Sequence, residues 1–86
     1  MAVKPLVYTR HAAEALSERE IDRSWVAETI EHPDWTVADP AGSGVERRYK
    51  AIRAFGDRIL RVVCLESAGE VRILTAFFDR KARRPQ

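Results

Sequence analysis

The segment that decides the fold runs from residue 58 to residue 78 and reads RILRVVCLESAGEVRILTAFF. Both of its ends are rich in Val, Ile, Leu and Phe, and they flank the short polar stretch ESAGE at residues 66–70. Two such runs around a short polar stretch with one glycine are typical of a β-hairpin. We therefore expect antiparallel strands at about residues 58–65 and 71–78, with Gly69 free to take a positive φ in the turn. Because this is the most apolar part of the chain, the other elements should pack on it.

Two more strands are expected before the hairpin. Residues 34–39 alternate and have strand propensity, and residues 45–55 read as a longer strand with many charges. The stretch between them, PAGSG, is rich in turn-forming residues. Gly56 and Asp57 then predict a tight turn into the hairpin.

Two helices are expected before the strands. Residues 10–19 contain no Gly or Pro and several Ala, and Thr9 is a suitable N-cap. A second helix should begin after the N-cap Asp22 and cover about residues 23–31. It should end before Pro33, because proline disfavours helical geometry in the residue that precedes it.

These elements predict one α+β domain over residues 1–86, with two N-terminal helices packed on one face of a three- to four-stranded antiparallel sheet. Alternation along the hairpin leaves a second face that is also partly apolar. Two short helices cannot cover both faces, so either the basic tail, residues 79–86, or another chain should cover the second one. The residues that we expect to bind a protein partner or a second copy there are Ile59, Val63, Ile73 and Phe77.

Composition indicates a soluble globular domain, because 45% of the 86 residues are hydrophobic and 33% are charged. The apolar runs are far shorter than the ~20 residues that span a bilayer, and the first residues show no apolar signal-peptide core. The one cysteine, Cys64, cannot form an internal disulfide and should be a small buried hydrophobe. A reducing compartment follows, so we expect a cytoplasmic protein with no membrane contact.

Charge is unevenly distributed along the chain. Residues 1–42 carry four basic and eight acidic side chains, whereas residues 43–86 carry eleven basic and five acidic ones. Twelve of the fifteen basic residues are arginine, whose planar fork suits phosphate and carboxylate. A basic half favours a polyanionic partner. The plainer interpretation is a solvated arginine-rich surface, and both stay open.

The residue types suggest one reaction that needs no metal. Two histidines and one cysteine show no metal-ligand spacing, and the four glycines form no phosphate loop. Histidine has an unperturbed pKa near neutrality, so His11 could act as base or acid when a ribose 2′-hydroxyl attacks its own phosphodiester. Arginine supplies the fixed positive charge that such a transition state needs. We expect Arg48, Lys50 and Arg61 to hold phosphate, Tyr49 to stack on a base or bind a phosphate, and Thr75 to orient an arginine or the substrate.

Structural explanations compete for the two most important of these residues. His11 shares its helix face with Ala15 and lies beside Ala12 and Leu16, so it could be a hydrogen-bonded structural histidine. Arg61 interrupts an apolar strand, which is costly unless the side chain is paired or functional. Its carboxylate partner would then be Glu14, Glu18 or Asp79.

Several short motifs together resemble a known family. They are YTRHA at residues 8–12, EREI at 18–21, the segments from Trp25 to Asp34 and from Leu60 to Val63, and ILTAFFDR at 73–80. In this order they resemble the small bacterial family known as domain of unknown function 4258, over about residues 7–84. That family is thought to be similar to RelE/ParE and BrnT toxins, so the resemblance implies a RelE-like fold and a metal-independent ribonuclease toxin that an antitoxin neutralises. It assigns functional positions to His11, Arg19, Arg61 and Thr75.

This sequence departs from the family pattern at two positions. Ala15 stands where many members have arginine, and Glu20 stands where glycine is usual, in the turn between the helices.

The residue types and the resemblance together give the hypothesis of a toxin-like ribonuclease or RNA-binding domain without metal or cofactor. Its catalytic residues would be His11, Arg61 and Thr75, and its RNA-binding residues Arg19, Arg48, Tyr49 and Lys50. The alternative is a non-catalytic module that binds a protein partner or forms a homodimer.

Overall fold

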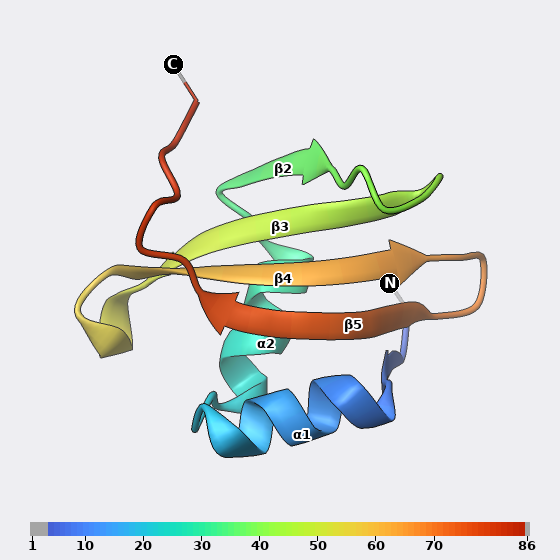
Figure 1. The fold of residues 1–86 in the computed structure, drawn as a ribbon, viewed down its shortest axis with the longest axis horizontal. Helices are drawn as coiled ribbons and strands as arrows, with labels where there is room; N and C mark the ends of the chain where they lie inside the picture. Colours follow the sequence, from blue (N-terminus) through green and yellow to red (C-terminus); the bar gives the residue numbers. More distant parts are fainter. Residues whose placement is uncertain (1–3, 86) are drawn as a thin grey trace.

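A computed structural model of the chain describes residues 4–85. Two helices pack on one face of a five-stranded sheet, and the other face is left largely uncovered (Figure 1). No helix in residues 4–85 is long and apolar enough to cross a membrane. The elements in chain order are β1 (Leu6–Tyr8), α1 (Arg10–Glu18), α2 (Arg23–Glu31), β2 (Trp35–Ala38), β3 (Val45–Ile52), the 3-10 helix η1 (Arg53–Phe55), β4 (Arg58–Glu66) and β5 (Val71–Phe78).

The predicted hairpin is present as β4 and β5 in the middle of the sheet. Its turn is closed by the backbone N–H of Ser67, which donates to the carbonyl of Glu70 at 2.9 Å. Gly69, which could take a positive φ at little cost, does not adopt one, and Gly44 and Gly56 are the glycines of the described chain that do. The turn therefore needs no left-handed residue.

The sheet differs from the expected one in having five strands and one parallel pair. Its order is β1-β5-β4-β3-β2, and β1 pairs with β5 in parallel while the other pairs are antiparallel. Three residues are too few to show an alternating pattern, so the sequence predicted only an extended lead-in here. Hydrogen bonds to the distant strand β5 hold β1 in place, for example from the N–H of Val71 to the carbonyl of Pro5 at 3.0 Å. In addition, the strand expected over residues 45–55 ends at Ile52, because η1 begins at Arg53.

Both helices begin at the predicted N-caps. The Thr9 hydroxyl accepts the N–H of Ala12 at 3.0 Å, and the Asp22 carboxylate accepts the N–H of Ser24 at 2.8 Å. Helix α1 ends with the N–H of Ile21 donating to the carbonyl of Leu16 at 2.9 Å, which is the six-to-one bond of a Schellman motif. That motif needs a left-handed residue, and Glu20 supplies it with φ +54°. This is the position at which the family resemblance leads one to expect glycine.

The core lies between the helices and the sheet. On β4 its members are the fully buried Leu60, Val62 and Cys64. Burial raises the pKa of the Cys64 thiol to about 11, so the thiol stays neutral at physiological pH. Cys64 therefore behaves as the small buried hydrophobe that the sequence predicted.

A β-bulge in β5 changes which residues face the helices. Val63 pairs with Thr75 but its neighbour Cys64 pairs with Ile73, so Leu74 is an extra residue in this strand. The alternation therefore reverses at Leu74, and Ile73 lies fully buried in the core. The prediction that placed Ile73 on the open face is wrong, since simple alternation was continued through the bulge.

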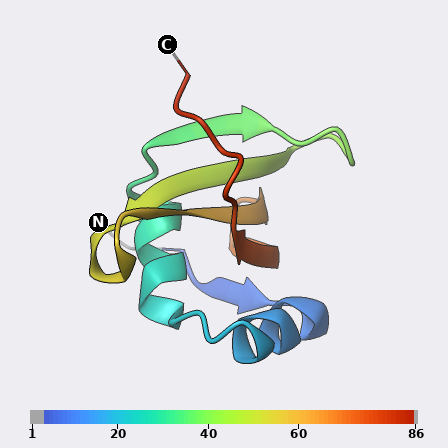
Figure 2. The same cartoon turned by 60° about the vertical axis from the view of Figure 1, so that its left-hand side comes forward.

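The basic tail crosses one end of the sheet. From the end of β5 it rises past the ends of β4 and β3 towards the start of β2 in both views (Figures 1 and 2). There Arg84 forms an ion pair with Asp34, with 3.4 Å between Nη2 and Oδ2. The tail thus covers part of the second face, and most of that face stays open.

Candidate functional site

The open face of the sheet carries a row of three aromatic residues and one arginine across four strands. Trp35 of β2 pairs with Tyr49 of β3, Tyr49 with Arg61 of β4, and Arg61 with Phe77 of β5. We call these four residues the Arg–aromatic row. Adjacent strands lie about 4.8 Å apart, so the row is about 14 Å long. The face that carries it is turned towards the viewer in Figure 1, opposite α2.

Two stacked rings form the β2 end of the row. The centroids of Trp35 and Tyr49 lie 4.7 Å apart with the ring planes at 8°. Tyr49 is only 6% exposed, because Trp35 covers it. Trp35 is half-buried and lies on the last strand of the sheet, so its outer ring face is available to a ligand.

Arg61 lies at the centre of the row. Its guanidinium carbon is 4.9 Å from the centroid of Phe77, and its Nη1 is 3.3 Å from an oxygen of Asp79. The Asp79 pair confirms one of the three structural partners expected from the sequence. The contact uses one nitrogen only, and the buried Nε of Arg61 has no hydrogen-bond partner in the described chain. An anionic group could therefore engage Arg61 without removing a strong bidentate pair.

Arg19 extends the row beyond β5. As the C-cap residue of α1 it reaches the sheet, where its Nη1 donates to the carbonyl of Ala76 at 3.0 Å. Its guanidinium carbon lies 5.9 Å from the centroid of Phe77, so Phe77 contacts two arginines. The structure thus brings together three predicted site residues: Arg19, Tyr49 and Arg61.

A second row runs beside the first. Val37, Arg47, Val63 and Thr75 pair in the same way across β2 to β5. Arg47 Nε donates to Asp39 at 2.8 Å, and this bond is the main reason that the pKa of Asp39 lies below its usual value. The charge of Arg61 lowers the same pKa further, so Arg61 lies near the ion pair of Arg47 with Asp39. Thr75 lies on this face as predicted, two positions from Phe77.

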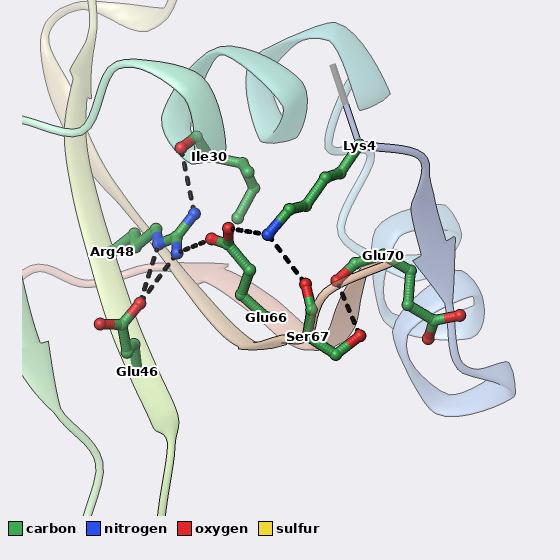
Figure 3. A network of polar contacts seen from close by, with 7 residues as sticks. All are labelled: Lys4, Ile30, Glu46, Arg48, Glu66, Ser67 and Glu70. Atoms are coloured by element: carbon green, nitrogen blue, oxygen red, sulfur yellow. Dashed lines mark hydrogen bonds and ion pairs between the residues drawn. The ribbon is translucent and has the colours of Figure 1, made fainter. Parts of the chain in front are cut away.

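Two residues expected to hold phosphate lie on the opposite face. Arg48 pairs with the fully buried Val62, and its guanidinium bonds the carbonyl of Ile30 at 3.1 Å, Glu46 at 2.8 Å and Glu66 at 2.7 Å (Figure 3). Its side chain is 11% exposed. Arg48 therefore holds the C-terminus of α2 onto the sheet.

Lys50 has the same kind of role. Its Nζ donates to the carbonyl of His32 at 2.9 Å and lies 3.8 Å from Asp34. Cations at a helix C-terminus bind its free carbonyls and oppose its dipole. The structure therefore separates Arg48 and Lys50 from Arg61 by the thickness of the sheet.

The carboxylate of Glu66 joins this helix-facing network. It accepts from Arg48 and also from Lys4, whose Nζ is 2.7 Å away (Figure 3). These two bonds, first that of Arg48, lower the pKa of Glu66 to about 2. Glu66 is thus ionised throughout the physiological range.

His11 does not join the row. It is exposed on α1, whereas its neighbours Ala12, Ala15 and Leu16 are buried. The side chain of His11 makes no hydrogen bond within residues 4–85, so the hydrogen-bonded structural histidine is not what the structure contains. Likewise, no hydrogen bond or ion pair of the described chain joins it to Arg61 or Thr75.

Sequence reasoning missed Trp35 and Arg47 as members of this surface, and assigned Phe77 only to a protein interface. Strand alternation does mark Arg47 and Tyr49 as sharing a face. However, residues 47–50 are all polar or aromatic, and their order alone does not show whether the odd or the even positions face the helices. The pairing of β3 with the apolar strand β4 decides that the even positions do.

Fold and surface together define a small α+β domain with an open, arginine- and aromatic-bearing sheet. The family described as domain of unknown function (DUF4258) matches residues 8–78. The chain belongs to this family. No curated protein matches the chain.

Proposed function

We propose that this protein binds single-stranded RNA on the open face of its sheet. The observation that carries the proposal is the Arg–aromatic row, in which three rings and one guanidinium group lie side by side across four strands. Aromatic rings and arginine planes stack on splayed bases, and arginines bind phosphates. A row of about 14 Å offers room for two or three bases.

Residues of the Arg–aromatic row and of the row beside it would contact different parts of the RNA. Trp35 offers a ring face for a base at the sheet edge. Arg61 and Arg47, which lie on neighbouring strands, offer guanidinium groups to the phosphates between bases. Asp39 and Asp79 hold these two arginines in place, and phosphate oxygens would share them with the carboxylates.

Cleavage is the second step of the proposal, and the binding of Arg61 to Asp79 through one nitrogen only favours it. The 2′-oxygen would attack phosphorus, the bond to the 5′-oxygen would break, and a 2′,3′-cyclic phosphate and a 5′-hydroxyl would form. Arg61 would stabilise the phosphorane. His11 would accept the 2′-hydroxyl proton or protonate the leaving oxygen, with Thr75 orienting the substrate. The similarity that this family is thought to have to RelE/ParE and BrnT toxins adds the expectation that expression of the protein arrests growth.

Binding is tested by fluorescence anisotropy with a labelled oligouridylate. Trp35→Ala should weaken binding by about 1–3 kcal/mol, the range for loss of one base–aromatic stack. Arg61→Gln should also weaken it and should reduce the dependence of affinity on salt. Arg10→Gln, which removes an exposed charge on α1, is the control. Equal affinity of Trp35→Ala, Arg61→Gln and the wild type would refute the proposal.

Cleavage is tested separately in EDTA with total RNA. Wild type should yield 2′,3′-cyclic phosphate ends, and the double variant His11→Ala, Arg61→Ala should not. Binding without any cleavage by the wild type would leave an RNA-binding domain and reject the enzyme.

An interface with a second copy is the alternative function, and the free edge of the sheet favours it. Strand β2 is an edge strand with the sequence WTVA, which contains no charge or proline to discourage pairing. Within this strand Val37 is 37% exposed, and Leu65 on the same face of the sheet is 36% exposed. Of the residues expected at this interface, Ile59, Val63 and Phe77 remain on the open face. Sedimentation velocity should then show a dimer that Val37→Lys dissociates, and a monomer at all concentrations would dismiss it.

A further inference from the structure

A cleft lies at the end of the sheet where the tail crosses it. Its walls are the turn before β4 and the tail after β5, and its volume is about 370 Å³. This volume is near the lower end of the range for small-ligand sites. The cleft is lined by Gly56, Asp57, Arg58, Ile59, Phe78, Asp79, Arg80, Ala82 and Arg83.

Three arginines of this lining have no carboxylate partner. Arg58, Arg80 and Arg83 form no ion pair in the described chain. The guanidinium carbon of Arg58 lies 4.8 Å from the centroid of Phe55. Nη1 of Arg83 donates to the carbonyls of Arg80 and Ala82, at 3.4 and 3.1 Å, which leaves the other N–H groups of this guanidinium free.

The negative charge in the cleft is smaller. Of its two carboxylates, Asp79 is already paired with Arg61 and also accepts the N–H of Lys81 at 2.9 Å. Only Asp57, in the turn, remains to oppose three guanidinium groups. The cleft therefore favours an anion.

The remaining lining is apolar. Ile59, Phe78 and Ala82 contribute to it, and Phe78 is held from behind by Phe55 at 4.8 Å and by Trp25 at 6.0 Å between ring centroids. A cleft with guanidinium groups and a packed aromatic ring suits a ligand that is both anionic and planar. Phosphate binds to arginine forks, and a base packs on apolar surface.

We propose that this cleft binds one nucleotide, with its phosphate on Arg58, Arg80 and Arg83 and its base against Phe78 and Ala82. The inference rests on the proposed RNA-binding function and deepens it. Asp79 belongs to the cleft and also holds Arg61, so the cleft continues the Arg–aromatic row at the end of the sheet. The nucleotide is either the 5′-phosphorylated end of a bound RNA or a free mononucleotide.

Two variants isolate the cleft. Arg80→Gln combined with Arg83→Gln removes two of its charges from the exposed tail, where folding does not depend on them. Arg10→Gln combined with Arg23→Gln removes the same charge from the helices and is the matched control. Binding of 5′-AMP and of adenosine is measured by isothermal titration calorimetry.

We expect 5′-AMP to bind the wild type at least tenfold more tightly than the tail double variant, and equally tightly to the matched control. Adenosine should bind at least tenfold more weakly than 5′-AMP. Equal affinity of wild type and tail variant for 5′-AMP, or no binding to either, would overturn the inference.

Two further comparisons separate the ligand sources and the two proposals. If the wild type prefers a 5′-phosphorylated heptauridylate over its 5′-hydroxyl form, and the tail variant does not, the ligand is an RNA end. If the two forms bind alike and 5′-AMP still binds, it is a free nucleotide. Binding of 5′-AMP without RNA binding rejects the proposed function and keeps the cleft. RNA binding that depends on Trp35, without 5′-AMP binding, rejects the cleft alone.

Discussion

Arg48 and Arg61 lie in the middle of adjacent strands, yet their surroundings differ completely. Arg48 faces the helices and bonds one carbonyl and two carboxylates. Arg61 faces the open side and has one ion pair of 3.3 Å, an aromatic ring and an unpartnered Nε. A strand arginine thus serves either the fold or a ligand according to the side of the sheet on which its position falls.

The largest effect should come from breaking the helix-facing network. Arg48→Gln leaves Glu46 and Glu66 without their common partner and releases the end of α2. We expect a loss of about 2 kcal/mol in the free energy of unfolding, less than for a fully buried pair because both carboxylates are partly exposed. Urea denaturation measures this value, and RNA affinity of the folded variant should not change. A loss of RNA affinity with unchanged stability would reverse the roles of the two faces.

Arg61→Gln should lower RNA affinity strongly and stability only slightly, the reverse of Arg48→Gln. It removes one part-buried ion pair and one cation–π contact, so we expect a loss of stability of about 1 kcal/mol or less. Its RNA affinity should fall more than that of any helix-facing variant. The same urea and anisotropy measurements decide this, and a stability loss equal to that of Arg48→Gln would remove the distinction.

Acid should weaken the helix-facing network through the protonation of Glu66. The pKa of Glu66 is about 2 in the folded protein and about 4.3 in an unfolded chain. Its contribution is therefore complete above about pH 5 and is lost as the pH falls towards 2. Because the Glu66 side chain is 39% exposed, we expect only about 0.5 kcal/mol. Glu66→Gln should thus be less stable than wild type at pH 7, and the difference should vanish near pH 2.

The smallest effect tests a position that belongs to neither face. Glu20 adopts φ +54° in the turn after α1, which a residue with a side chain adopts at a cost. Glu20→Gly should stabilise the fold by about 0.5 kcal/mol, because glycine reaches this region freely but loses more entropy on folding. Thermal unfolding measures the gain, and RNA affinity serves as the control, since it should stay the same.

Much of the fold could be predicted from local patterns. The hairpin and both N-caps follow from residues that are close in sequence. The Arg61–Asp79 pair follows because an arginine within an apolar strand needs a counter-charge. In contrast, β1 exists only through its pairing with β5, and the bulge at Leu74 follows from how two strands align. Neither leaves a local signal.

The candidate site was predictable in composition but not in arrangement. Arg19, Tyr49, Arg61 and Thr75 were assigned from residue type and motif, and the structure places them on the open side of the sheet. Arg48 and Lys50 were assigned by the same reasoning and lie on the other side. In the run RRYK at residues 47–50 every residue suits a phosphate or a base. Only the pairing with β4 shows that the first and third residues of this run lie on the open face and that the second and fourth face the helices.

The extra residue Leu74 divides β5 into two parts, and the side chains of each part alternate independently between the two faces of the sheet. Residues 71–73 and 75–78 each alternate, but with opposite parity. Deletion of Leu74 would therefore restore simple alternation and leave Thr75 and Phe77 on the open side, with Ala76 and Phe78 facing the core. Regular pairing of Leu74 without a bulge would instead exchange the two sides of the strand beyond it. The bulge thus lets β5 contain one residue more than its partner strand requires while Phe77 stays beside Arg61.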